Sequence, residues 1–505
     1  MKRRSAMFAV SILLSGAVLL AAVGCGGGET TVDTDPHDKD FSPYRTASAM
    51  EAAYDYKHFF LPEEDAAGQG YVGDPMPYYE DGTYYIYYLK DQGDSYNHSV
   101  YLTTTQDFVT YEEYQEPVLE ASRGSEQDAW IGTGSVVKVG EKYYFFYTGH
   151  NTSREYHETI MVAEGDSPTS FVKKEGWEIL PPESLWQKND FRDPQAYYDA
   201  ETETITLTIT AAQSDIGRIV TYTLNGDLSD PQYGGIIFTN PEDIVGDVWN
   251  LECSDTFQIG GRWYLTFSAQ DGALWYTSSD TRYGVYEEEP RPLDGQLFYA
   301  AKTVTDGTNT YMVGWARRSE SPSSTQDVNA WAGNLVVQKV VEREGGGIVL
   351  APVDAYLAAD VQRTLLSDST VGLSAGDYVD AFTCQERFVV TGQFSYTGTG
   401  DFGLAFDYNG RMDRYKLVSF SPEDQEISLS FNLGSVYITG TPVTLEAGRT
   451  YSFTYLQEGS VGIMYLDGET AFTVRVYGVS GRAVRLFAEN NSVTFSDLRQ
   501  FTYSY

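Results

Sequence analysis

Five strand-like runs, rich in aromatic and β-branched residues, recur through the first two thirds of the chain. They occupy residues 82–88, 140–147, 202–209, 261–267 and 308–315. Successive runs lie 59, 62, 58 and 47 residues apart, measured between Tyr84, Tyr143, Ile205, Trp263 and Thr310. Recurrence on this scale is typical of propellers and solenoids, and the composition predicts a small antiparallel sheet for each unit. We therefore predict a five-bladed β-propeller around a central channel, with each run as the second strand of its blade.

The pattern changes after the glycine-rich segment 344–347. From about residue 373 many shorter strands alternate with glycine and aspartate turns, as at residues 394–396, 415–421, 451–456 and 484–489. This pattern predicts a β-sandwich, which either belongs with the propeller or is an unrelated appended module. We thus expect an all-β chain with a propeller domain at residues 45–360 and a C-terminal β-sandwich at residues 373–505.

Residues 1–24 have the layout of a cleaved secretory signal peptide. Basic residues at positions 2–4 precede an apolar run at 6–23, and Ala22-Val23-Gly24-Cys25 resembles a bacterial lipobox. Ala22 stands where leucine is usual, so a plain signal peptide or an N-terminal anchor helix is the alternative. We expect Cys25 to be the lipidated first residue of an exported protein at the bacterial cell surface or envelope. A flexible, lipid-anchored tether would follow at residues 25–44.

The charge balance limits the classes of partner and substrate that the protein can bind. The chain carries 72 acidic and 34 basic residues, which gives a formal net charge of −38. Such a surface repels nucleic acid and anionic lipid head groups, so we expect no nucleic acid partner and membrane contact only through the lipid anchor. A polyanionic substrate is disfavoured, whereas a neutral one is not. Aromatic residues, 40 tyrosines among them, can stack on sugar faces but also fill β-sheets.

The sequence offers no metal-ligand or cofactor motif. The five histidines lack zinc-like spacing, and neither a P-loop, a dinucleotide fingerprint nor a Gly-x-Ser-x-Gly elbow is present. After Cys25 only Cys253 and Cys384 remain, in different predicted domains, so the chain is not a disulfide scaffold. We predict an activity that needs no metal and no cofactor, while a structural calcium ion stays an open alternative.

An acidic motif near the middle of the chain is the first candidate for chemistry. Arg192, Asp193 and Pro194 are adjacent, and Pro194 favours an extended backbone at Asp193. On an extended strand the side chains of Arg192 and Asp193 would point to opposite faces. A lone Arg-Asp-Pro is most often an ordinary loop salt bridge. Its position in the repeat therefore decides whether it is better interpreted as part of a functional site.

The repeat places three acids together. Asp74 lies 10 residues before its marker, Asp193 lies 12 before and Glu252 lies 11 before. We therefore expect equivalent positions on the inner strands of blades one, three and four, at one mouth of the channel. The matching regions of blades two and five offer hydroxyl and aromatic side chains, among them Trp130, Thr133 and Tyr299. Unless three of 72 acids share this register by chance, the result is a polar pocket for a neutral polyol.

The same residues carry a family resemblance. The motifs Arg192-Asp193-Pro194, Glu252-Cys253 and Gly73-Asp74-Pro75 resemble the Arg-Asp-Pro, Glu-Cys and Asn-Asp-Pro motifs of glycoside hydrolase family 32, the fructan hydrolases and invertases. Together with further similar segments in the same order, they cover residues 70 to 355. The resemblance implies a five-bladed propeller followed by a β-sandwich, and cleavage of β-fructofuranosyl bonds with retention of configuration.

The resemblance also implies residue roles. Asp74 would be the nucleophile, Glu252 the general acid/base and Asp193 a transition-state stabiliser. Retention needs one carboxylate that attacks the anomeric carbon and one acid that protonates the leaving oxygen, and a third carboxylate can hold ring hydroxyls as positive charge develops. Substrate-binding roles would fall to Arg192, Trp130, Thr133 and Tyr299.

Three departures from the family pattern leave the substrate open. Gly73 replaces the usual asparagine, Met76-Pro77 replaces Asn-Gly, and Leu89 stands where a sugar-binding glutamine is common. We expect a surface glycosidase that acts on fructans or sucrose-type oligosaccharides. The alternatives are a fructotransferase on levan or inulin, an arabinan- or xylan-cleaving enzyme of the family 43 type, and a sugar-binding lipoprotein without catalysis. Linkage preference, endo or exo action, and oligomeric state are open.

Overall fold

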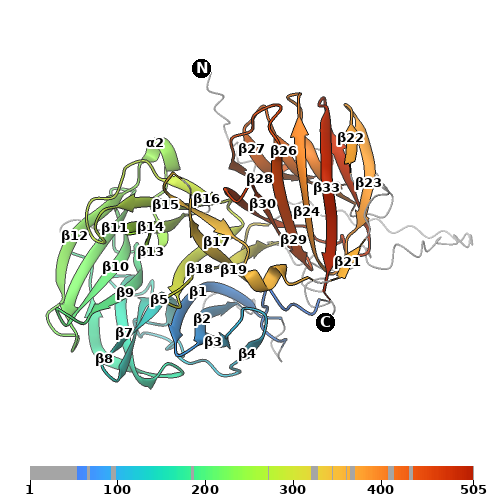
Figure 1. The fold of residues 1–505 in the computed structure, drawn as a ribbon. Coiled ribbons are helices and arrows are strands. Elements are labelled where there is room, and N and C mark those ends of the chain that lie inside the picture. Colours follow the sequence, from blue (N-terminus) through green and yellow to red (C-terminus); the bar gives the residue numbers. More distant parts are fainter. Residues whose placement is uncertain are drawn as a thin grey trace, which may run out of the picture.

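The computed structural model describes residues 54–64, 69–91, 98–182, 187–270, 272–319, 328–343, 345–359, 361–363, 370–407, 415–431 and 436–503. Within them the chain is nearly all β-strand and forms a ring of blades beside a two-sheet sandwich (Figure 1). No helix among these residues is long and apolar enough to cross a membrane. The predicted signal peptide (1–24), Cys25 and the tether (25–44) lie outside the described residues and stay predictions.

Five antiparallel units of four strands build the ring, in chain order. Blade one consists of β1 (Tyr71–Glu80), β2 (Thr83–Asp91), β3 (Val100–Thr105) and β4 (Tyr111–Glu113). Blade two consists of β5 (Trp130–Val139), β6 (Lys142–His150), β7 (Glu158–Ser167) and β8 (Ser170–Ile179). Blade three consists of β9 (Phe191–Asp199), β10 (Thr204–Gln213), β11 (Ile216–Asn225) and β12 (Gln232–Thr239).

Two further blades complete the ring. Blade four consists of β13 (Leu251–Ile259), β14 (Arg262–Ala269), β15 (Leu274–Ser279) and β16 (Arg291–Asp294), preceded by the short helix α2 (Glu242–Val245). Blade five consists of β17 (Phe298–Thr305), β18 (Thr310–Arg318), β19 (Ala330–Glu342) and β20 (Ile348–Ala351). The first and last blades join where β1 pairs with β19 at Val72 and Gly333. The predicted propeller is confirmed, and the five predicted runs are its second strands.

The inner strands share one irregularity. In β1, β9, β13 and β17 two consecutive residues face a single residue of the second strand, which is a β-bulge, and β5 carries a bulge at Thr133. The first bulge residue has a left-handed backbone in four blades, with φ of 43° at Asp74, 60° at Asp193, 53° at Cys253 and 52° at Ala300. Bulges bend a strand and re-aim its side chains. The channel mouth is therefore lined by a repeated backbone feature.

The C-terminal part is the predicted sandwich of two antiparallel sheets, packed around aromatic side chains. One sheet contains β21 (Val361–Arg363), β22 (Thr370–Leu373), β24 (Arg387–Tyr396), β29 (Tyr451–Glu458), β30 (Val461–Leu466), β31 (Thr470–Arg475) and β33 (Val493–Thr502). The other contains β23 (Asp377–Thr383), β25 (Phe402–Asp407), β26 (Tyr415–Ser421), β27 (Glu426–Phe431), β28 (Val436–Pro442) and β32 (Ala483–Ala488). A 3₁₀ turn (Asp354–Leu357) lies between propeller and sandwich in the chain.

Buried polar contacts fasten the sandwich to blades four and five. Arg475 in β31 donates hydrogen bonds to the carbonyl oxygens of Ala316 (2.7 Å) and Arg317 (2.9 Å). Asp294 in β16 accepts from the backbone N–H of Thr473 at 2.8 Å and from its hydroxyl at 2.6 Å. Because both charged groups are fully buried, losing either partner would leave an unpaired group in the junction.

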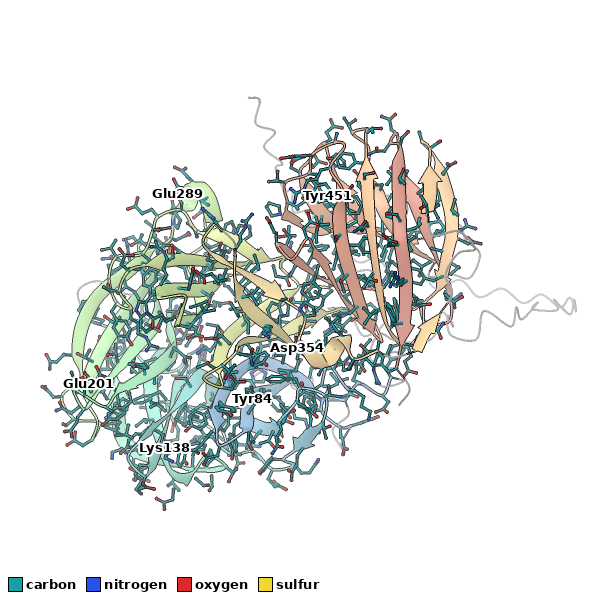
Figure 2. All side chains as sticks on the ribbon, in the orientation of Figure 1. Tyr84, Lys138, Glu201, Glu289, Asp354 and Tyr451 are labelled. Atoms are coloured by element: carbon teal, nitrogen blue, oxygen red, sulfur yellow. The ribbon has the colours of Figure 1, made fainter. Side chains whose placement is uncertain are left out.

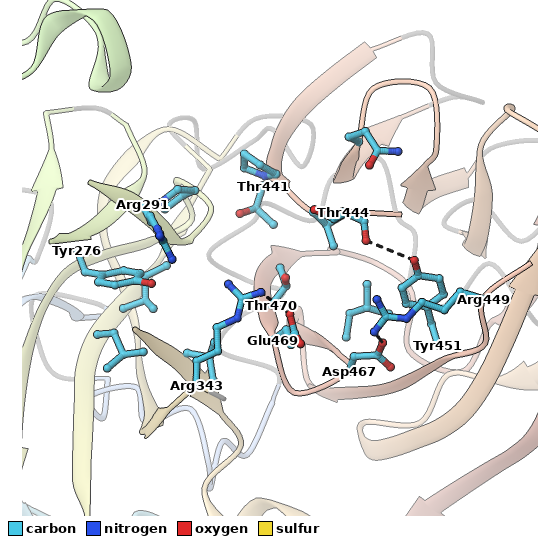
Figure 3. Close-up of a pocket in the computed structure, with 18 residues that line it drawn as sticks. Tyr276, Arg291, Arg343, Thr441, Thr444, Arg449, Tyr451, Asp467, Glu469 and Thr470 are labelled. Carbon is cyan, nitrogen blue, oxygen red and sulfur yellow. Dashed lines mark hydrogen bonds and ion pairs between the residues drawn. The ribbon is translucent and has the colours of Figure 1, made fainter. Parts of the chain in front are cut away.

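A cleft of about 520 Å³ also lies between the two parts (Figure 3). Propeller residues such as Tyr276 and Arg343 face Tyr451 and Glu469 of the sandwich across it. Arg343 pairs with Glu469 across the cleft, and Arg449 pairs with Asp467 at 2.8 Å within the sandwich wall. Figure 2 shows that side chains fill the space between the strands in both the propeller and the sandwich.

Candidate active site

The candidate site is a cavity of about 250 Å³ at the mouth of the channel. All five inner strands contribute to it, because each bulge brings the residues around it to the channel mouth. Its lining residues are Asp74, Gly132, Thr133, Arg192, Asp193, Glu252, Cys253, Gln270, Tyr299, Trp315, Arg317, Asn329 and Trp331. The three predicted acids are therefore brought together, as the repeat suggested.

Asp74 sits among neutral donors. Thr133 donates its hydroxyl to Asp74 Oδ2 at 2.8 Å, and the Trp315 indole N–H donates to Oδ1 at 3.2 Å. Burial raises the pKa of Asp74 above its ordinary value, the two hydrogen bonds oppose that rise, and the charge of Glu252 adds to it. Both oxygens are thus fixed in orientation by neutral donors, and the charge of Lys302 acts on the carboxyl group only from a distance.

Glu252 sits in a different setting. Its Oε1 accepts a hydrogen bond from Arg192 Nη2 at 2.6 Å, and its Oε2 accepts a short hydrogen bond from the Tyr299 hydroxyl. Burial and the charge of Glu252 keep the pKa of Tyr299 well above its ordinary value, so Tyr299 remains a donor. One carboxylate oxygen therefore meets a cation and the other a neutral hydroxyl.

Asp193 is held by one backbone group and one hydroxyl group of the neighbouring blades. Its Oδ2 accepts from the Cys253 N–H at 2.8 Å, and its own N–H donates to Thr148 Oγ1 at 2.9 Å. Burial raises the pKa of Asp193 to about 7 against the opposing charge of Arg192, and Glu252 and Asp74 add to the rise. This carboxyl group gains or loses its proton near neutral pH.

Two expectations about backbone geometry were wrong. Asp193 is left-handed rather than extended before Pro194, and Arg192 and Asp193 line the same cavity instead of pointing to opposite faces. The bulge causes this, since it turns the second of two adjacent side chains back toward the channel. The three acids are also not strictly equivalent, because Asp74 and Asp193 open their bulges whereas Glu252 precedes Cys253, which opens the bulge of β13.

The predicted binding residues divide into two groups. Arg192, Thr133 and Tyr299 line the cavity. Trp130, at the start of β5, lies outside that lining and stacks on His150 with ring centroids 4.8 Å apart and planes 5° apart. Several other residues of the lining had no predicted role. Among them, Trp315 and Trp331 stand in segments that resemble family motifs, so a binding role could have been predicted for both.

The departure at Gly73 has a structural reason. A Cβ atom on residue 73 would overlap the six-membered ring of Trp331, so the indole fills the space that a side chain there would need. Trp331 in turn stacks on His98 with centroids 4.3 Å apart. Met76 also has a local partner, since its sulfur accepts the Gly134 N–H at 3.0 Å. One wall of the cavity is thus aromatic where the family pattern has an amide.

Among the described residues, no group of three or more His, Cys, Asp or Glu side chains is arranged to hold a metal ion. Cys253 and Cys384 are both buried and free. The side chains that line the cavity offer carboxyl, hydroxyl, guanidinium, thiol, amide and indole groups. Two carboxylates in unlike surroundings can take unlike roles, one as an ionised nucleophile and the other as a proton donor.

Comparisons with known proteins agree with this geometry. The chain matches the family described as the glycosyl hydrolases family 32 N-terminal domain over residues 66–352. It is 22% identical to sucrose-6-phosphate hydrolase of Escherichia coli over 342 residues, which are 63% of this chain and 68% of that protein.

Solved structures share the fold over almost the whole chain. A β-fructofuranosidase of Aspergillus kawachii superimposes with a TM-score of 0.72 at 17% identity, covering 91% of this chain and 96% of that one. Fructan 1-exohydrolase IIa of Cichorium intybus superimposes with a TM-score of 0.69 at 16% identity, covering 92% and 98%. The arrangement of propeller and sandwich is therefore common to all three.

Proposed function

The chain belongs to glycosyl hydrolase family 32 and is a glycosidase, and on this premise we propose that it cleaves β-fructofuranosyl linkages with retention of configuration. The substrates would be sucrose-type oligosaccharides or fructans, which is the class that the names of its relatives share. The observation that carries the proposal is the meeting of Asp74, Asp193 and Glu252 in one cavity with three different sets of partners.

Asp74 is the nucleophile in this proposal. Its oxygens are oriented by Thr133 and Trp315, both neutral donors, which hold the carboxyl group in place for attack on the anomeric carbon. The carbon that it attacks gains positive character in the transition state, which favours the ionised carboxylate despite the burial that raises its pKa. Attack gives a covalent glycosyl-enzyme and releases the leaving group.

Glu252 is the acid and then the base. It gives its proton to the leaving oxygen in the first step and takes one from water in the second. Arg192 and Tyr299 keep the carboxyl group in one orientation through both steps. Asp193 would hold ring hydroxyls more tightly as positive charge develops, which selectively stabilises the transition state.

The size of the cavity favours action at a chain end. Its 250 Å³ is smaller than the roughly 300–1,000 Å³ of pockets that enclose drug-sized ligands. One sugar unit fits such a space, and the rest of the substrate must lie outside the mouth. We place this activity on an exported, lipid-anchored protein, a location supported by the N-terminal sequence around Cys25.

Product analysis tests the proposal. The purified protein is incubated with sucrose, inulin and levan, and with arabinan and xylan as contrasting polymers, and products are separated by chromatography. We expect free fructose from a fructoside, released first as the β-anomer in time-resolved NMR, and no product from the Asp74→Asn variant. Longer fructans would instead support a transferase, pentose release would support a family 43-type specificity, and binding without product would support a sugar-binding protein.

A further inference from the structure

Behind Arg192 lies a second carboxylate that the proposed chemistry does not use. Glu158 begins β7 in blade two and is buried, with only 6% of its surface exposed. Its Oε2 accepts the Phe191 backbone N–H at 2.9 Å and Arg192 Nη1 at 3.2 Å. Glu158 therefore joins blade two to the inner strand of blade three at the residue beside Asp193.

Arg192 is consequently shared between the site and the layer behind it. While Nη2 contacts Glu252 at 2.6 Å, Nη1 contacts Glu158 and also Asp190 Oδ1 at 3.3 Å. Asp190 is fixed in turn by the Asn250 side-chain amide at 2.9 Å. One buried cation thus stands between one carboxylate that faces the cavity and two that do not.

The surroundings of Glu158 and Arg192 determine whether these two side chains are ionised. Burial opposes ionisation of Glu158, but the charge of Arg192 and hydrogen bonds from His150 and Phe191 hold the pKa of Glu158 below its ordinary value. Burial likewise opposes the charge of Arg192, while Glu158 and Glu252 keep the pKa of that guanidinium well above its ordinary value. The pair behind the site is therefore ionised at neutral pH.

The proposed first step places a demand on this arrangement. Glu252 must hold a proton before it can act as an acid, and the positively charged guanidinium of Arg192 lies 2.6 Å from its Oε1. The carboxylates of Glu158 and Asp190, on the far side of the guanidinium, partly offset the positive charge that Arg192 presents to Glu252. They also fix the position of the guanidinium. Truncating one of them would leave Arg192 with one anionic partner fewer behind the site.

We propose that Glu158, supported by Asp190, is a positioning residue that orients Arg192 and offsets its charge, so that Glu252 can hold the proton needed by the leaving group. This inference rests on the proposed function, because it assigns Glu252 the acid role. The charged and titratable groups that line the cavity around Glu252 are Arg192, Tyr299, Asp74, Asp193, Cys253 and Arg317, the last of which lies over the Tyr299 ring. Those facing Glu158 are Arg192 and His150, whose Nδ1 lies 3.3 Å from Glu158 Oε1.

The test is the pH profile of kcat/KM for Glu158→Gln, which removes the charge but keeps an oxygen for the Phe191 N–H. We expect the basic limb to move to lower pH by about one unit, and kcat at pH 7 to fall about tenfold on a sugar leaving group. A fructoside whose leaving group needs no proton should lose less. Glu158→Asp should restore most of the wild-type profile, and Asp190→Asn should move the limb in the same direction.

A matched control lies on the same strand. Glu164 in β7 pairs with Lys142 at 2.9 Å near the surface, and Glu164→Gln should leave profile and turnover unchanged. If Glu158→Gln lowers turnover equally for both leaving groups and leaves the basic limb in place, Glu158 is merely structural and the inference is overturned.

A crystal structure separates this inference from the proposed function. In Glu158→Ala we expect the Arg192 guanidinium to leave its wild-type position, a readout that needs no turnover. An unmoved guanidinium would overturn the positioning role even in an active enzyme. Absence of fructoside hydrolysis by the wild-type protein would instead contradict the proposed function, whatever Arg192 does.

Discussion

The channel mouth of the propeller and the core of the sandwich both exclude much of the solvent but are chemically opposite. In the sandwich, the Phe394 ring packs against Phe420, Phe402 and Tyr451 with centroids 4.5, 5.0 and 5.3 Å apart. At the channel mouth Asp193 is buried and Asp74 is half-buried, and each is a left-handed residue, a conformation that most side chains avoid. The same exclusion of water therefore acts on rings in one region and on carboxylates in the other.

The difference shows what each region contributes. Burying aromatic surface is favourable, at about 25 cal/mol per Å² removed from water. Burying carboxylates and holding strained backbone is unfavourable, and it persists because the surrounding strands fix it. We expect substitutions at the channel mouth to remove activity without loss of stability, and substitutions in the sandwich core to do the reverse.

The largest effect should come from Asp74→Asn. Loss of the nucleophile should lower kcat by at least about 10⁴-fold, in the range seen when a catalytic nucleophile is removed. The melting temperature should stay equal or rise, because a buried carboxylate is replaced by a neutral group of similar shape. Steady-state kinetics and thermal unfolding measure both, and a variant that is inactive because it unfolds would break the comparison.

Glu252→Gln should have the next largest effect on turnover. Loss of general acid/base action should cost about 10²–10⁴-fold on natural substrates. A fructoside with a strongly acidic leaving group should keep a faster first step and accumulate the glycosyl-enzyme, which mass spectrometry of the intact protein can detect. Equal losses on both kinds of substrate would contradict the acid role.

Phe394→Ala probes the opposite region. The ring is completely buried in the sandwich, so its removal should cost about 3–5 kcal/mol of unfolding free energy. Denaturant unfolding followed by circular dichroism measures that loss, while kcat/KM of the remaining folded protein should stay within about twofold of wild type. A large fall in kcat/KM would show that the sandwich shapes the site after all.

The smallest expected effect is a pH dependence of stability at Asp193. Its folded pKa is about 7, above the value of about 3.9 for an unperturbed aspartate. Between these values the folded state binds a proton that the unfolded state does not, so this contribution to stability is present below pH 4 and is lost as pH rises through 7. Asp193→Asn should flatten the fall in unfolding free energy between pH 4 and pH 7.5 by at most about 4 kcal/mol, followed by denaturant unfolding at each pH. An unchanged slope would contradict the raised pKa.

Much of the fold followed from sequence because its signals are local. Aromatic and β-branched runs such as residues 82–88 and 140–147 form the second strands, where alternate side chains fill the space between blades. One cavity contains Asp74, Asp193 and Glu252, as their positions in the repeat predicted, because the blades repeat at nearly constant spacing. Repetition therefore converts sequence offsets into positions in space.

The rest depended on contacts that no local pattern encodes. Pro194 favours an extended residue before it, yet the sheet imposes a left-handed Asp193, so tertiary structure overrides a local preference. Trp331 reaches Gly73 only because β19 closes the ring beside β1. Glu158 follows no motif, and its approach to Arg192 depends on how blade two packs against blade three.

The repeated bulge on the inner strands makes this frame a convenient starting point for engineering. The bulge forms with aspartate, cysteine or alanine as its first residue, as Asp74, Cys253 and Ala300 show, so its backbone does not depend on one side chain. A gene library randomised at residues 74, 133, 193, 253 and 300 would vary the floor of the channel and leave the pairing between strands untouched. Selection from such a library would test new side chains for new reactions while the fold stays the same.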